Sequence, residues 1–131
     1  MNRAVTDTHA LVWYLARPKR LGRAATRLFL AAEAGRAQIL IPSVLLVELA
    51  LLREHGRKVL GVAEVMAAVA QSDSLAFTPF HLQEAREFAL LSSLDDPFDR
   101  MMVATARVLG CALITGDEII TSSGLTPVVW D

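Results

Sequence analysis

The 131-residue sequence predicts an α/β fold, in which a central, mostly parallel sheet of four to five strands carries helices on both faces. Short apolar runs alternate along the chain with longer segments of helical periodicity. The apolar runs are continuous, which is typical of parallel strands buried on both sides. Hydrophobic residues make up 53% of the chain, and a sheet covered on both faces explains this high fraction.

The strands are predicted from short apolar or β-branched runs that end at breaking or polar residues. The run at 38–41 ends at Pro42, and the run at 75–78 ends at Pro79. Five strands follow from this pattern, and we place them at residues 4–6, 38–41, 75–78, 111–115 and 127–130.

The helices are predicted from the residues that begin and end them. Ser43 is expected to cap a helix that reaches about His55. Asp96 followed by Pro97 is the pattern of an N-cap and a first helical residue, and Gly110 is expected to close that helix. The remaining helices are predicted at residues 8–16, 22–34, 59–71 and 82–91, with a loop at 17–20 and a short turn or helix before the last strand.

Length, charge and cysteine content narrow the class of protein. A chain of 131 residues without repeats or linkers is expected to form one domain over residues 1–131. High apolar content and a net charge of −1 exclude a disordered chain and a uniformly basic nucleic-acid binder. The single Cys111 indicates a reducing compartment, so we expect a cytoplasmic protein. The longest uncharged run, residues 119–130, is too short for a membrane span.

Acidic residues follow the carboxyl ends of two predicted strands, where sites in open parallel sheets lie. Asp7 comes directly after the first strand, and Asp117 follows the fourth. Each also has a structural explanation as a helix cap or turn residue. For either residue alone, that explanation is sufficient.

Glu48 is harder to explain as a structural residue. Its neighbours three and four positions away on the predicted helix are all apolar, namely Val44, Leu45, Leu51 and Leu52. A buried carboxylate must be paired, protonated or bound to metal, because burying an isolated charge is costly. We therefore predict a functional role for Glu48.

Asp96 and Asp99 flank a Pro-Phe pair at the start of a predicted helix. The N-cap role explains Asp96 fully. A carboxylate at the position of Asp99 also suits the helix dipole. However, the apolar residues Met102 and Val103 follow it along the same face, so Asp99 is predicted to point toward the sheet edge.

Together these acids predict a metal site. The fold brings Asp7, Asp99 and Asp117 to one rim of the sheet, and the helix after the second strand can add Glu48. Carboxylates packed together repel one another, and Mg²⁺ or Mn²⁺ would relieve this repulsion. Such a site suits hydrolysis of phosphodiester bonds. The alternative is a noncatalytic α/β binding module in which the acids are helix caps and turn residues.

In the segments that carry these acids, the sequence resembles the PIN-domain ribonucleases, in particular the VapC-type toxins of bacterial type II toxin–antitoxin systems. The Asp-Pro-Phe-Asp-Arg segment at 96–100 is the most specific part of the resemblance. The resemblance covers the whole chain in order and implies a three-layer PIN-like fold. Its matching segments are residues 7–13, 42–49, 96–106, 113–117 and 128–130.

The resemblance implies the chemistry and partners as well. It implies an endoribonuclease that cleaves single-stranded or loop RNA to leave a 3′-hydroxyl and a 5′-phosphate. It further implies a homodimer that a cognate antitoxin neutralises. The four acids that match the family's Mg²⁺ or Mn²⁺ ligands are Asp7, Glu48, Asp99 and Asp117, with Thr115 and Asp96 in supporting positions. In one departure, relatives often carry His where this chain has Leu94, followed by Asp95.

Basic residues cluster in the first part of the chain. Residues 1–36 carry a net charge of +5, and residues 37–131 carry −6, so the total of −1 is a cancellation. Arg20, Arg23 and Arg27 are predicted to share one helical face and are candidates for binding RNA phosphates, although a solvated helix face also explains them. Arg100 is a candidate for steering a phosphate or pairing with an acid.

Overall fold

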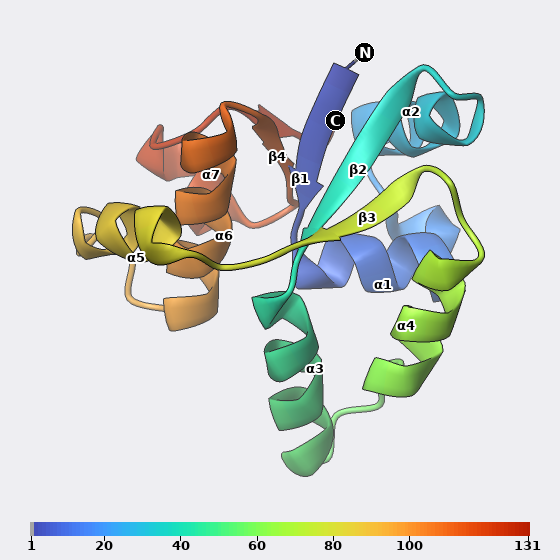
Figure 1. Cartoon of the computed structure of the whole chain (residues 1–131), viewed down its shortest axis with the longest axis horizontal. Helices are drawn as coiled ribbons and strands as arrows, with labels where there is room; N and C mark the ends of the chain where they lie inside the picture. Colours follow the sequence, from blue (N-terminus) through green and yellow to red (C-terminus); the bar gives the residue numbers. More distant parts are fainter. Residues whose placement is uncertain (1) are drawn as a thin grey trace.

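The computed structural model describes residues 2–131 and contains a five-stranded sheet of order β3-β2-β1-β4-β5 (Figure 1). Every pair of neighbouring strands is parallel. The strands are β1 (Asn2–Thr6), β2 (Ala37–Pro42), β3 (Leu75–Thr78), β4 (Ala112–Ile114) and β5 (Val128–Val129). This confirms the predicted parallel α/β sheet, with the larger of the two expected strand numbers.

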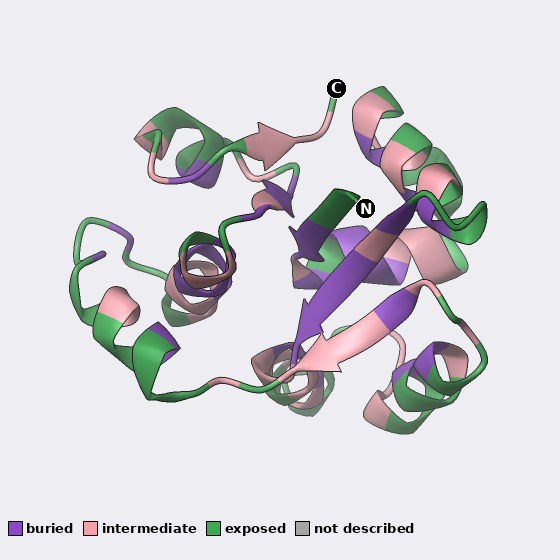
Figure 2. Ribbon diagram, turned by 45° about the horizontal axis from the view of Figure 1, so that its top comes forward, coloured by how far each residue is buried: buried purple, intermediate pink, exposed green. Residues whose placement is uncertain are grey.

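Helices cover both faces of the sheet. α1, α2 and α4 lie on one side, and α5, α6 and α7 lie on the other (Figure 2). None of the helices within residues 2–131 is long and apolar enough to cross a membrane. The helical elements are α1 (Thr8–Ala16), the 3-10 helix η1 (Pro18–Arg20), α2 (Arg23–Glu33), α3 (Val44–Glu54), α4 (Val62–Ala70), α5 (Leu82–Ala89), α6 (Pro97–Leu109) and α7 (Glu118–Ser123).

The core lies between the central strands and the helices on either side. Buried residues concentrate on β2 and on the inner side of α6 (Figure 2). Ile39, Leu40 and Ile41 are consecutive and all buried, so β2 meets apolar side chains on both faces. Burial on both faces is the reason that this strand is a continuous apolar run.

Several predicted boundaries are confirmed by the capping geometry. Asp96 caps α6 with Pro97 at the first helical position, and Gly110 ends this helix with a φ of 65°. That left-handed conformation suits glycine, because glycine has no Cβ. Ser43 is the residue before α3, and the helix ends next to His55, as predicted, but the backbone of Ser43 is already helical and its side chain makes no capping hydrogen bond.

Two further differences concern loops. α4 begins at Val62 rather than at residue 59, because the helix is capped at Gly61 by a hydrogen bond from the Gly61 N–H to Glu64 Oε1 (3.2 Å). The segment that contains Arg20 forms η1, and the extended Gly22 separates it from α2. The prediction that Arg20 shares one helical face with two arginines of α2 was therefore wrong.

The last residues of the chain pack against two glycines. The Ala25 N–H donates to the Trp130 carbonyl oxygen over 2.9 Å. A Cβ on Gly22 would lie 2.3 Å from that same oxygen, and a Cβ on Gly116 would lie 2.7 Å from the Trp130 ring. The close approach of Trp130 to the start of α2 and to the turn after β4 therefore depends on residues without side chains.

We predict that Gly22→Ala destabilises the fold by about 1–3 kcal/mol more than Gly61→Ala does. Both glycines are extended N-caps, so the intrinsic effect of alanine at a cap is matched between the two variants. At Gly61 the nearest atoms belong to the flexible ends of side chains, the closest being Glu64 Oε1 at 3.1 Å. Urea denaturation measures the two free energies of unfolding, and equal values would contradict the prediction.

Candidate metal centre

Acidic side chains from four helical segments meet at the carboxyl end of the sheet. They line one pocket of about 380 Å³, together with polar and aromatic neighbours. β1 and β4 end next to each other at this edge, and the Asp7 N–H donates to the Ile114 carbonyl oxygen over 3.1 Å. The five acids in the pocket are Asp7, Glu48, Asp96, Asp99 and Asp117, which are the five acidic residues named from the sequence.

Three of these acids cap helices. Asp7 accepts a hydrogen bond from the Ala10 N–H of α1, and Asp117 accepts one from the Ile120 N–H of α7, each over 2.9 Å. Asp96 caps α6. Three helix N-termini therefore point toward the pocket, and their partial positive charge favours carboxylates there. The structural explanation of these acids is correct, and it is compatible with their lining a pocket.

Glu48 is positioned by a hydroxyl group from another helix. Thr8 is buried in the first turn of α1, and its hydroxyl donates a hydrogen bond to Glu48 Oε1. The carboxylate itself is half-buried. This helix face is less buried than the sequence predicted, since Leu51 is 38% exposed. The contact with Thr8 joins residues 40 positions apart in the chain.

Thr115 connects two of the acids. Its side chain is buried, its oxygen accepts the Asp117 N–H over 3.1 Å, and its hydroxyl is hydrogen-bonded to the Asp7 carboxylate. A single side chain therefore fixes the turn after β4 and orients the carboxylate after β1. This arrangement fits the supporting position that the sequence suggested for Thr115.

The pocket disfavours the charged form of three of its carboxylates. Burial raises the pKa of Asp7 to about 6, although hydrogen bonds from Thr115 and Ala10 act in the opposite direction. Burial likewise raises the pKa of Glu48, against the hydrogen bond from Thr8. The pKa of Asp99 is raised to about 7, first by burial and then by the negative charges of the surrounding acids, which are Asp96, Asp117, Glu48 and Asp7.

The donor set fits a hard divalent cation. Carboxylate oxygens are the preferred ligands of Mg²⁺ and Mn²⁺, and no Lys or Arg lines this pocket. Within residues 2–131 the ion pairs are Arg53–Glu64 and Arg107–Glu87, and neither lies in the pocket. The other four carboxylates raise the pKa of Asp99, yet no three potential ligands among the described residues are gathered into a formed metal cluster.

Sequence reasoning missed several residues of the pocket. Thr8 follows Asp7 directly, but only the folded chain shows that it contacts Glu48. His9 is exposed, and its charge lowers the pKa values of Asp7 and Glu48. Trp13, Met102 and Gly116 complete the lining. None of these five residues was named as a site residue from the sequence.

The basic candidates separate into three locations. Arg20 lines a second, larger pocket next to the acidic one. Arg23 and Arg27 are exposed on α2 and line neither of these two pockets. The Arg100 guanidinium lies 4.0 Å from the centre of the Phe88 ring and donates to the Phe88 carbonyl oxygen over 2.8 Å. Arg100 therefore contacts α5.

The departure from the family pattern has a structural explanation. Leu94 is buried and belongs to the hydrophobic core, while Asp95 is exposed. Neither residue lines the acidic pocket. The substitution therefore leaves the five carboxylates unchanged.

Solved structures of similar fold come from bacterial toxin–antitoxin complexes. VapBC2 from Rickettsia felis, bound to a DNA fragment from its promoter, matches with a TM-score of 0.71 and 15% identity over 98% of this chain and 99% of that chain. DNA-bound VapBC from Salmonella typhimurium matches with a TM-score of 0.69 and 17% identity over 98% and 97%.

A third similar structure is a single toxin. Mycobacterium tuberculosis VapC20, described as a toxin that cleaves the sarcin–ricin loop, matches with a TM-score of 0.62 and 19% identity over 96% of this chain and 98% of that chain. No protein of curated function matches this sequence. At these identities, the structural matches show a shared fold.

The sequence itself matches a family model over most of its length. The PIN domain model aligns with residues 4–122, a range that begins within β1 and ends within α7. All five acids of the pocket lie inside this range. Because the match spans far more than half of the sequence, this chain belongs to the PIN domain family.

Proposed function

We propose that this protein is a Mg²⁺- or Mn²⁺-dependent endoribonuclease of the VapC type, the toxin of a type II toxin–antitoxin pair. The observation that carries this proposal is the pocket in which five carboxylates meet without a Lys or Arg. Membership of the PIN domain family supports a nuclease, and the fold shared with VapC20 supports RNA as the substrate.

The residues have separate roles in this proposal. Asp7, Glu48, Asp99 and Asp117 would hold the cation, and a bound divalent cation supplies an activated water and stabilises charge on the phosphate. Thr8 keeps the Glu48 carboxylate in place. Thr115 orients Asp7 in the same way, so the ligands are held by hydrogen bonds to rigid elements.

The reaction is hydrolysis of a phosphodiester bond. The water oxygen bonds to phosphorus, the bond to the ribose 3′-oxygen breaks, and that oxygen takes up a proton. The products carry a 5′-phosphate and a 3′-hydroxyl. No side chain of the protein forms a covalent intermediate in this scheme.

A noncatalytic binding module is the competing function, and the capping hydrogen bonds of Asp7, Asp96 and Asp117 favour it. Asp99 argues for the nuclease instead. It caps no helix, and its half-buried side chain lies within range of four other carboxylates. The dipole of α6 favours a carboxylate in this first turn, but the surrounding negative charges disfavour the ionised form of Asp99.

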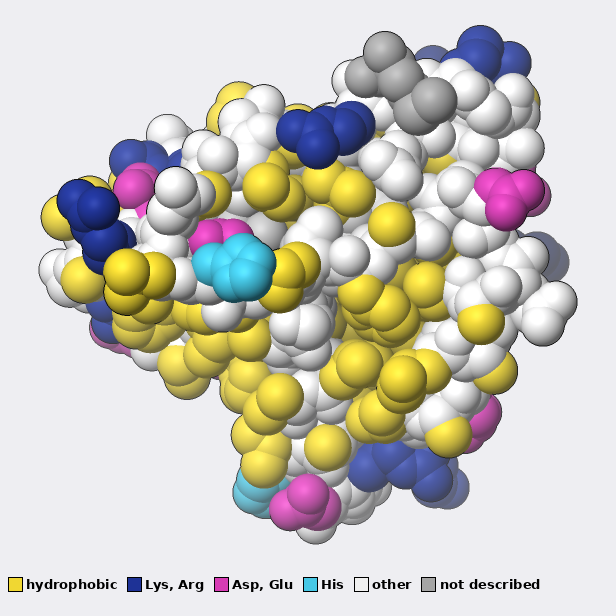
Figure 3. Space-filling model, in the orientation of Figure 1, with side chains coloured by type: hydrophobic (Ala, Val, Ile, Leu, Met, Phe, Trp, Pro, Cys, Tyr) yellow, Lys and Arg dark blue, Asp and Glu magenta, His cyan; other side chains and the backbone are white. Residues whose placement is uncertain are grey.

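We also propose two protein partners. The VapBC structures of similar fold are complexes of toxin and antitoxin, and this supports a cognate antitoxin for the present chain. Exposed hydrophobic side chains support a homodimer. They include Val47 and Leu51 on α3 and Leu82 on α5, two helices that both pack against α6, and others lie on α2, α4 and α7. Hydrophobic atoms form much of the surface in Figure 3.

We predict that Asp99→Asn lowers the rate of RNA cleavage at least about 100-fold, because it removes a ligand that contributes several kcal/mol of charge stabilisation. The assay measures initial rates on a structured RNA with Mg²⁺ or Mn²⁺. Asp95→Asn is the matched control, since Asp95 is an exposed acid outside the pocket. Cleavage that persists in EDTA, or that survives in Asp99→Asn, would contradict the mechanism.

We predict that the metal-free protein loses stability as the pH rises from about 4 to about 7. In this range the unfolded carboxylates are ionised, while Asp7 and Asp99 in the folded protein still hold protons because their pKa values are about 6 and about 7. The folded state therefore binds more protons, and raising the pH favours unfolding.

Urea denaturation across this pH range in EDTA measures the effect. Asp99→Asn should give a shallower decline than the wild-type protein, because one of the groups with a raised pKa no longer titrates. Asp95→Asn should follow the wild-type curve. A free energy of unfolding that increases between pH 4 and pH 7 would show that folding does not raise the pKa values of these carboxylates.

We predict that Leu82→Lys shifts the protein from dimer to monomer. Leu82 is 77% exposed on α5, so a charge there opposes burial in an interface without disturbing the core. Leu30→Lys is the control, because Leu30 is 54% exposed on α2, on the other side of the sheet. Analytical ultracentrifugation gives the mass of each variant. A dimer that persists in Leu82→Lys but dissociates in Leu30→Lys would assign the interface to α2.

A further inference from the structure

A larger basic pocket adjoins the acidic one. Its volume is about 890 Å³, and two residues of α1, His9 and Trp13, line both pockets. The two hollows are therefore neighbouring parts of one surface. The basic residues that line the larger pocket are Arg17, Arg20, Arg53, Arg57 and Lys58, and we call this pocket the basic groove.

Most of the positive charge in the basic groove is unpaired. The only acid in its lining is Glu64, and Glu64 Oε1 lies 4.0 Å from Arg53 Nη1. Within residues 2–131, no ion pair involves the other four cations of the groove. All four are exposed. The groove therefore presents free cations directly beside a pocket of carboxylates.

Two separate parts of the chain form the walls of the groove. One wall is the end of α1 with η1, which carries Arg17 and Arg20. The other is the segment 56–60 between α3 and α4, which carries Arg57 and Lys58. Each wall supplies two of the unpaired cations, so a bound chain would meet positive charge on both sides.

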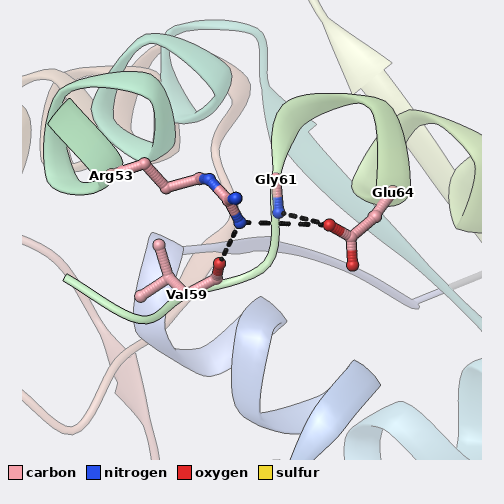
Figure 4. A network of polar contacts seen from close by, with 4 residues as sticks. All are labelled: Arg53, Val59, Gly61 and Glu64. Carbon is pink, nitrogen blue, oxygen red and sulfur yellow. Dashed lines mark hydrogen bonds and ion pairs between the residues drawn. The ribbon is translucent and has the colours of Figure 1, made fainter. Parts of the chain in front are cut away.

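The segment 56–60 is held in place by a small polar network (Figure 4). Arg53 Nη1 donates to the Val59 carbonyl oxygen over 2.8 Å, and Glu64 Oε1 accepts the Gly61 N–H over 3.2 Å. Because Arg53 and Glu64 also lie close together, α3 and α4 are both tied to this segment. Arg53 is thus a positioning residue, and the cations at 57 and 58 are presented from a fixed loop.

Aromatic rings lie where the groove meets the acidic pocket. The ring centroids of His9 and Trp13 are 5.8 Å apart, and the Arg20 guanidinium lies 5.9 Å from the Trp13 ring centroid. Rings next to cations are the combination that binds single-stranded nucleic acids, because bases stack on the rings while phosphates contact the cations. An acidic peptide would use the cations but would leave these rings without a specific role.

We propose that the basic groove binds the phosphate backbone of single-stranded RNA on one side of the bond that is cleaved, through Arg17, Arg20, Arg57 and Lys58. This inference rests on the proposed nuclease function. A divalent cation in the acidic pocket would attract only the phosphate that reacts, so cations beside the pocket are needed to attract the rest of the polyanion. The groove meets that pocket at His9 and Trp13, and its contacts therefore fall on one flank of the substrate.

The test compares two double variants of equal charge change. Arg57→Gln with Lys58→Gln removes one wall of the groove, and Arg23→Gln with Arg27→Gln removes two exposed cations of α2 outside it. Fluorescence anisotropy measures binding of a labelled single-stranded RNA of roughly 12 nucleotides. The titrations run in EDTA, so that the RNA stays intact, at several sodium chloride concentrations.

The groove variant should bind the RNA roughly tenfold more weakly, and its slope of log K against log salt should be shallower by about 1.4, since each phosphate contact on a single strand contributes about 0.7. The α2 variant should retain the wild-type slope. Equal losses in both variants, or an unchanged slope in the groove variant, would overturn the proposal. A groove variant that keeps RNA affinity but loses a labelled polyglutamate peptide would instead identify an acidic protein as the ligand.

The binding titrations, together with a cleavage assay in Mg²⁺ or Mn²⁺, separate this inference from the proposed function. A protein that binds RNA through the groove but cleaves none with Mg²⁺ or Mn²⁺ would refute the nuclease and leave the groove in place. A protein that cleaves RNA but whose RNA affinity does not depend on Arg57 and Lys58 would refute only the proposal that the basic groove binds RNA. Thermal melting of both double variants serves as the control for folding, and both should melt at the wild-type temperature because the substituted residues are exposed.

Discussion

Repulsion among carboxylates is the constraint on which the arrangement of this protein depends. Five acids share one pocket, and burial together with their mutual charge raises the pKa of Asp99 to about 7. Helix N-termini and the hydroxyl groups of Thr8 and Thr115 offset part of this cost. Each such interaction contributes only about 1 kcal/mol, so the carboxylates stay together because they extend from elements anchored in the core.

The parts of the fold that could be predicted are those that local chemistry decides. Burial on both faces makes β2 a continuous apolar run, and Asp96, Pro97 and Gly110 each act on their own backbone. Ser43 shows the limit of such reasoning. Its N–H donates to the Thr78 carbonyl oxygen of the neighbouring strand, a contact that no local pattern contains, and its own backbone is already helical.

The candidate site was predictable to a similar degree. Asp7 and Asp117 could be named because parallel strands end at one edge of the sheet, and Glu48 could be named because its neighbours on the helix are apolar. The pairing of Thr8 with Glu48 could not, because it joins α1 to α3. Arg100 is the opposite case: its neighbour Asp99 lines the pocket, while its own side chain packs on Phe88 of α5. Adjacent residues of a helix face different directions, so proximity in sequence was a poor guide there.

The distribution of charge along the chain differs from its distribution on the folded surface. Along the chain, the positive excess lies in residues 1–36 and the negative excess in the remainder. On the folded surface that division does not hold, since the basic groove takes Arg20 from the first part and Arg57 from the second. The arginines of α2 contribute to the net charge but not to the groove. A protein with a net charge of −1 therefore presents a cationic surface beside an anionic pocket. This arrangement suits a polyanionic substrate, because the cations attract its backbone while its reacting phosphate enters among the carboxylates.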